Sequence, residues 1–150
     1  MTNTGCGVAR RLGSAAHGNA RYNFGMYAVG DGRGPGPALM GANTLLGNDV
    51  CNKDGEDLGD MREFMIDMAS GKVAYAVLSF GGPLGMGDKL FAVPWAALAL
   101  DTENRRFTLN VPKAVLKDAP GFDQDRWPSM SDKTWARGVH AFYGTPYESA

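Results

Sequence analysis

The chain has 150 residues, of which 44% are hydrophobic and 21% charged, and its formal net charge is −1. This length fits one domain with a hydrophobic core, and the balanced charge argues against a general nucleic-acid binder, which carries a clustered basic excess. Two cysteines are too few for a disulfide framework. The sequence also contains no run of about 18 consecutive apolar residues, the length that a membrane-spanning helix needs. We therefore expect a cytoplasmic protein without membrane insertion.

The first 40 residues differ in composition from the rest. They contain nine glycines, four arginines and one acidic residue, Asp31, so their net charge is +3 and the remainder carries −4 to reach the total of −1. The stretch DGRGPGP at 31–37 favours neither helix nor strand. We predict a flexible tail over 1–40 rather than a transit peptide, because glycine opposes the amphipathic helix that such peptides need. Met40 is a candidate translation start.

The region from 45 to 111 indicates short strands separated by turns. The dipeptide Asp54-Gly55 within NKDGED is typical of a hairpin turn, since glycine accepts a positive φ. The strand that follows alternates apolar and polar residues, and we expect one of its sides to be formed by Leu58, Phe64, Ile66 and Met68. The sequence ASGK at 69–72 then predicts a second turn.

Three further stretches complete the predicted sheet. KVAYAVLSF at 72–80 is apolar on both faces, which predicts a strand covered on both sides. KLFAVP at 89–94 is a strand ended by Pro94, and residues 97–111 form a hairpin around 102–105. Five short strands without a long intervening helix predict a mainly β fold, with a small, highly bent, closed or nearly closed barrel over 41–118.

The segment 119–150 is expected to be an aromatic C-terminal extension with a helix. Pro112 suits the start of a short helix over 112–118, and the irregular stretch that follows holds the anchors Phe122 and Trp127. A final helix can begin near Ser131 or Asp132, both good N-caps, and end at Gly144. Its apolar stripe comprises Trp135, Val139, Phe142 and Tyr143.

The glycine-rich stretch GGPLGMGDK at 81–89 has to be weighed against phosphate-binding loops. Gly82 and Gly87 have the spacing of a Walker loop, but Asp88 stands where the lysine is required, and a carboxylate repels phosphate. The dinucleotide-binding order of glycines also fails, because a strand follows where that motif needs a helix. We expect a tight, backbone-dominated connection between two strands and no cofactor.

No metal or catalytic constellation emerges from the remaining polar residues. Asp123 and Asp125, with Asp132 nearby, could hold a hard cation weakly, but we favour roles as turn caps. Val50 stands where a calcium loop aligned on Gly55 needs a carboxylate, and no histidine or cysteine lies at zinc-ligand spacing. We expect the histidine of the final helix, residue 140, to be a surface residue, and we predict no enzymatic activity.

Residues 45–98 resemble the PRC-barrel family, known from the H subunit of the photosynthetic reaction centre and from a ribosome maturation factor. The motifs occur in the family's order: G-x-x-V at 47–50, DGE-x-L-G at 54–59, a G-K-V turn, G-G-x-L-G-x-G-D-K and A-V-P-W. The extension resembles that of small stand-alone bacterial members, so the likeness covers about 45–147. It implies a bent β-barrel that serves as an assembly module without a shared catalytic site.

These observations lead to a function hypothesis with one alternative. We expect a non-enzymatic protein–protein interaction module, in the form of a homodimer, because both faces of 72–80 need a cover that the final helix or a second subunit can supply. We favour a core position for Trp95. The candidate structural or interaction residues are Gly81, Gly82, Gly85, Gly87, Asp88, Pro94, Trp95, Trp127, Trp135 and Tyr143. The alternative is a protein that binds a small ligand or metal ion through its acidic and glycine-rich loops.

Overall fold

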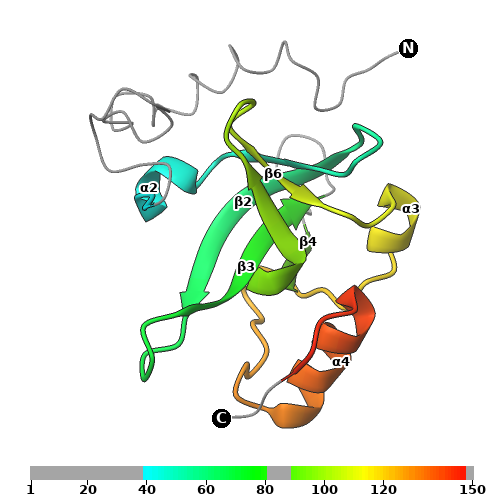
Figure 1. The fold of residues 1–150 in the computed structure, drawn as a ribbon. Helices are drawn as coiled ribbons and strands as arrows, with labels where there is room; N and C mark the ends of the chain where they lie inside the picture. Colours follow the sequence, from blue (N-terminus) through cyan, green and yellow to red (C-terminus); the bar gives the residue numbers. More distant parts are fainter. Residues whose placement is uncertain (1–38, 81–88, 148–150) are drawn as a thin grey trace.

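The computed structural model describes residues 39–80 and 89–147, which form a sheet with helices at its ends (Figure 1). The strands are β1 (Asp49–Cys51), β2 (Asp57–Ile66), β3 (Val73–Phe80), β4 (Lys89–Pro94), β5 (Leu98–Asp101) and β6 (Arg106–Leu109). The helices are α2 (Ala42–Leu45), the 3-10 turn η4 (Trp95–Ala97), α3 (Lys113–Leu116) and α4 (Lys133–Tyr143). The predicted tail over 1–40 lies almost entirely outside the described residues.

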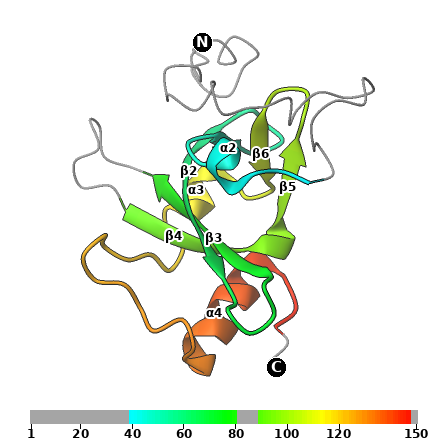
Figure 2. The same cartoon turned by 90° about the vertical axis from the view of Figure 1, so that its left-hand side faces the viewer.

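The six strands form one sheet in the order β4-β3-β2-β1-β6-β5. Adjacent strands in this sheet pair antiparallel, with one exception: β1 runs parallel to β6, and Val50 lies opposite Phe107. The sheet curls into a half-barrel (Figures 1 and 2). The mainly β fold that we predicted is confirmed, and the short strand β1 adds a sixth strand to the expected five.

Strand β2 bends because its register against β3 shifts twice, between Met61 and Glu63 and between Met65 and Ile66. The first shift leaves Arg62 as an extra residue in β2, and the second leaves Ala74 as an extra residue in β3, so each strand loses its regular alternation at one point. Of the apolar row that we expected on one side of this strand, Leu58 is buried and Phe64 packs against the core. Ile66, at the end of the strand, is 48% exposed, and Met68, in the turn after it, is 88% exposed. Met61, which lies outside that row, is buried as well.

The hydrophobic core has two parts on opposite sides of β3. Ala76 and Leu78 face the interior of the half-barrel, where Phe91 and Phe107 also lie. Tyr75 belongs to a second cluster with Val139 of α4. The prediction that β3 is covered on both faces is confirmed, and its cover is α4 of the same chain, so this strand alone no longer calls for a second subunit.

The C-terminal elements follow their local sequence signals. The side chain of Asp132 accepts a hydrogen bond from the N–H of Thr134, and Gly144 ends α4 with φ 71°. Before α4, Phe122 and Leu90 exchange two backbone hydrogen bonds of 2.9 Å, which places the extension along the outer edge of β4. The predicted final helix and the anchoring role of Phe122 are both confirmed.

The turn between β1 and β2 is tied to α3 by one buried amide, that of Asn52. Its Nδ2 donates to Glu56 Oε1 at 2.7 Å and to the carbonyl oxygen of Val111 at 3.1 Å. Its Oδ1 accepts hydrogen bonds from two N–H groups of the turn, at Asp54 and Glu56. The N–H of Lys113, at the start of α3, donates to Glu56 Oε1 at 3.0 Å. Asn52 thus ties its own turn to Val111, and the Glu56 side chain that it positions ties the same turn to the start of α3.

Candidate functional site

Half of the predicted interaction residues form the connection between β3 and β4 and lie outside the described residues. These are Gly81, Gly82, Gly85, Gly87 and Asp88. The other five are described, and the structure does not bring them to one surface. Pro94 is buried at the end of β4 opposite Tyr75, so it is part of the sheet.

Trp95 lies at the boundary between core and surface. Its ring packs edge-on against Phe64 and Phe107, at centroid distances of 5.8 and 6.0 Å, while 38% of the residue is exposed. The expected core position is therefore wrong, because η4 turns the chain outward immediately after Pro94. A tryptophan held from behind by two aromatic rings presents a fixed apolar surface.

The remaining aromatic candidates divide between surface and interior. Trp127 is 41% exposed, packs on Phe122 and donates from Nε1 to the carbonyl oxygen of Gln124 at 2.8 Å. Trp135 packs on Tyr75 of β3 with ring centroids 5.3 Å apart. The Tyr143 hydroxyl is buried and has no hydrogen-bond partner within 39–80 and 89–147, and burial raises its pKa far above the usual value. Trp135 and Tyr143 therefore serve the packing of α4.

The turn between β2 and β3, residues 67–72, is the most exposed part of the sheet. Asp67 stabilises it from within, since its carboxylate accepts hydrogen bonds from the N–H of Ala69 at 3.0 Å and from Ser70 Oγ at 3.1 Å. The bond from the Ala69 N–H is the main reason why the pKa of Asp67 lies below its usual range. Gly71 adopts φ 78°, as the predicted turn requires.

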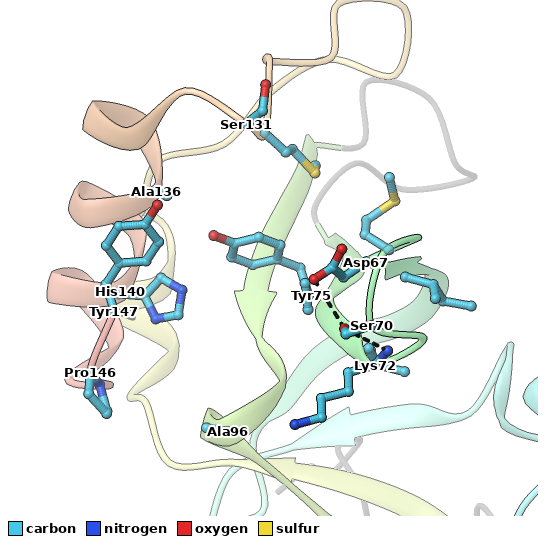
Figure 3. A pocket seen from close by; sticks show the side chains of 15 residues that line it. Asp67, Ser70, Lys72, Tyr75, Ala96, Ser131, Ala136, His140, Pro146 and Tyr147 are labelled. Atoms are coloured by element: carbon cyan, nitrogen blue, oxygen red, sulfur yellow. Dashed lines mark hydrogen bonds between the residues drawn. The ribbon is translucent and has the colours of Figure 1, made fainter. Parts of the chain in front are cut away.

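A cavity of about 720 Å³ opens between this turn and α4 (Figure 3). One wall comes from the end of β2, the turn and the start of β3, and includes Lys72 and Tyr75. The other wall comes from α4 and the segment after it, with His140 and Tyr147. Cavities of this size are typical of small-molecule sites. Periodicity could not reveal it, because its two walls come from segments about 65 residues apart in the chain.

His140 has a different environment from the surface position that we expected. Its ring lies 5.6 Å from that of Tyr75 and 5.3 Å from that of Tyr147, and its Nδ1 is 2.9 Å from Thr145 Oγ1. Burial lowers the pKa of His140 below its usual value, so the ring is neutral at pH 7. The surface prediction is wrong because α4 turns this side chain toward β3.

Searches for other kinds of site give negative findings for residues 39–80 and 89–147. Within these ranges no group of three or more histidine, cysteine, aspartate or glutamate residues could hold a metal ion. In the same part of the chain, no helix has the length and apolar character needed to span a membrane. Cys51 is fully buried in β1.

Comparison with known proteins agrees with the fold. None of the curated proteins compared with the chain matches it. The family model described as the PRC-barrel domain matches residues 37–116, which span α2 to α3 and every strand of the sheet. The motifs on which we based the resemblance, including DGE-x-L-G and A-V-P-W, fall inside this match. The chain therefore belongs to the PRC-barrel family.

Proposed function

We propose that this PRC-barrel protein is a non-enzymatic interaction module that forms a homodimer through one end of its sheet. The observation that carries the proposal is the exposed apolar group, defined as Ile66, Met68 and Trp95. These residues are 48%, 88% and 38% exposed, respectively. Large apolar side chains exposed together in this way are typical of protein–protein contacts.

The register of the sheet puts the members of this group at the same end. Ile66 pairs with Val73 at the start of β3, and Pro94 pairs with Tyr75 two residues further along that strand. Trp95 follows Pro94 directly, so Ile66 and Trp95 flank the first residues of β3. Tryptophan is enriched at the energetic centres of interfaces, and Trp95 is already held rigid by Phe64 and Phe107.

The absence of enzymatic activity remains part of the proposal. Its support is that two titratable side chains at the cavity have structural contacts: Asp67 stabilises its own turn and His140 contacts Thr145. The near-neutral charge supports a protein partner over nucleic acid. A cytoplasmic location stays a prediction.

Sedimentation velocity tests the dimer. We expect the wild-type chain to self-associate at micromolar concentration, and Met68→Lys to weaken association about tenfold, the effect of roughly 1.4 kcal/mol, by placing a charge in the contact. Because Met68 is almost fully exposed, the substitution should change the free energy of unfolding by less than about 0.5 kcal/mol.

Val115→Lys is the matched control, since Val115 is 44% exposed on α3, away from the β2–β3 turn (Figure 1). It should leave association unchanged. A wild-type chain that stays monomeric at several hundred micromolar would contradict the dimer. Equal weakening by both lysine substitutions would contradict the location of the contact.

The alternative function, ligand or ion binding by the acidic and glycine-rich loops, stays a prediction. A rise in melting temperature on adding metals, nucleotides or anionic metabolites would support it, because a ligand that binds only the folded state stabilises that state.

A further inference from the structure

We propose that the cavity between the β2–β3 turn and α4 binds a small planar aromatic acid. The site goes beyond the assembly role and does not rest on it, because one chain supplies every wall of the cavity. At about 720 Å³ the cavity can enclose a ligand of one or two fused rings with its substituents.

The first argument is the aromatic wall that faces the cavity. Tyr75, His140 and Tyr147 lie in sequence along it, with successive ring centroids 5.6 and 5.3 Å apart (Figure 3). Trp135 supports Tyr75 from behind at 5.3 Å. Tyr75 is itself 6% exposed, so the wall is largely formed before any ligand arrives. Aromatic rings prefer offset or edge contacts with other rings, which favours a flat aromatic ligand.

Thioether side chains extend the apolar lining. Met65 of β2 and Met130, which precedes α4, both line the cavity and pack against the second hydrophobic cluster. Sulfur makes favourable contacts with aromatic ring edges, and methionine adapts its shape to different ligands. The lining therefore suits a ring system better than an aliphatic chain of the same volume.

The second argument is the charge at the cavity. Asp67 and Lys72 are its two charged lining residues at pH 7, given that His140 is neutral. The Asp67 carboxylate is already occupied by the hydrogen bonds of its own turn. The Lys72 ammonium has no ion-pair partner among the residues that the structure describes, and its side chain extends along the cavity toward Ala96 (Figure 3). A ligand carboxylate would complement it.

A quaternary ammonium ligand is the competing occupant, because three aromatic rings can also enclose a cation. Lys72 opposes that choice, since its positive charge borders the same cavity. The carboxylate that could have attracted a cation, Asp67, accepts hydrogen bonds from Ala69 and Ser70 instead. The formal charges of Asp67 and Lys72 cancel, so the preference for the acid rests on the groups that are available: both Asp67 oxygens already accept hydrogen bonds, whereas the Lys72 ammonium has no ion-pair partner among the described residues.

Three probes with the same ring system separate these possibilities: 2-naphthoate, 2-naphthylmethanol and 2-naphthyltrimethylammonium. Their binding to the full chain can be measured by NMR titration, with the amide signals of Ala74, Ala96 and Ala136 reporting on the cavity. We expect saturable binding of the acid, about two- to fivefold tighter than the alcohol, the effect of one exposed charge pair. The ammonium should bind most weakly.

Two variants assign the effect to named residues. Lys72→Gln should abolish the preference for acid over alcohol, whereas Lys117→Gln, on an exposed lysine that does not line the cavity, should preserve it. Tyr147→Ala should weaken the binding of the acid and of the alcohol by the same factor, about two- to tenfold, because it removes one aromatic ring from the cavity wall.

Three results would overturn the proposal: no saturable binding of any probe, tightest binding of the ammonium, or a preference for the acid that survives Lys72→Gln. Lys72 is exposed, so its substitution leaves the folded state available for the test. Because one chain supplies every wall of the cavity, saturable probe binding by a chain that stays monomeric would contradict the dimer and leave this proposal standing.

Discussion

Two turns of the same sheet, Lys53–Glu56 and Asp67–Lys72, use the same local chemistry for different ends. Each contains a glycine at positive φ, Gly55 at 82° and Gly71 at 78°. Each is preceded or opened by a side chain whose oxygen accepts hydrogen bonds from the turn's own N–H groups: Asn52 in the first and Asp67 in the second. The two turns differ in what lies around them.

The first turn is fastened to distant segments, and the second is not. The Asn52 amide also donates to Val111, 59 residues away, whereas the Asp67 carboxylate accepts hydrogen bonds from Ala69 and Ser70, which lie within three residues of it. The chain beside the second turn instead carries exposed Ile66 and Met68 and one wall of the cavity. The first turn thus stabilises the barrel, and in our proposals the second turn presents side chains to a partner and a ligand.

The largest expected effect is a loss of stability from a substitution near the start of β2, next to the first turn. Gly59 has φ 115°, and a Cβ at this position would overlap the backbone carbonyl oxygen of Ser79. We expect Gly59→Ala to lower the free energy of unfolding by about 3–5 kcal/mol, since neither backbone can move aside easily. Gly71→Ala is the control: nothing lies within 4 Å of its added Cβ, so only the backbone strain of about 1 kcal/mol applies. If urea unfolding gave the same loss of unfolding free energy for Gly59→Ala and Gly71→Ala, the proposed difference between the two positions would be contradicted.

The second-largest expected effect is the loss of stability when the Asn52 side-chain amide is removed. Asn52→Ala removes the bonds to Val111 and Glu56, so the Val111 carbonyl and the N–H groups of Asp54 and Glu56 lose this partner. We expect a loss of about 2 kcal/mol in the free energy of unfolding, measured by urea titration. A loss below about 0.5 kcal/mol would show that Asn52 does not fasten the turn to the rest of the fold.

The same variant makes a smaller prediction about pH. The hydrogen bond from the Asn52 side chain is the main cause that holds the pKa of Glu56 below its usual 4.5, with that from the Lys113 N–H second. This pairing stabilises the fold above pH 4.5, and the benefit disappears as pH falls through the lowered pKa of the folded state. In Asn52→Ala the pKa of Glu56, followed by NMR, should rise toward its usual value. An unchanged titration would assign the shift to other groups.

Local patterns predicted the parts of the fold whose signals are contained in a short window. The apolar run of β3, the Pro94 end of β4, the hairpin from β5 to β6 and the Asp132 and Gly144 caps of α4 all formed where expected. The parallel pairing of β1 with β6 joins segments more than 50 residues apart, and no local pattern encodes it.

The candidate site was less accessible to sequence reasoning, for two physical reasons. Alternation placed Ile66 and Met68 on one side of the strand with Leu58, but it could not show that the end of the sheet leaves these two residues uncovered, so the exposed apolar group was missed. The cavity exists only because α4 folds back onto β3, which brings His140 beside Tyr75. Periodicity placed His140 off the apolar stripe of its helix but could not show what lies opposite.

The central claim is that the end of the sheet formed by the β2–β3 turn and η4 is the surface through which this protein associates. A dilution series of amide NMR spectra tests it most directly, because signals at a contact broaden or shift as concentration rises. The account predicts changes confined to residues 66–72 and 95–97, with Lys53–Glu56 and α3 unchanged. Changes centred on Lys53–Glu56 or α3, or no change at any concentration, would contradict it.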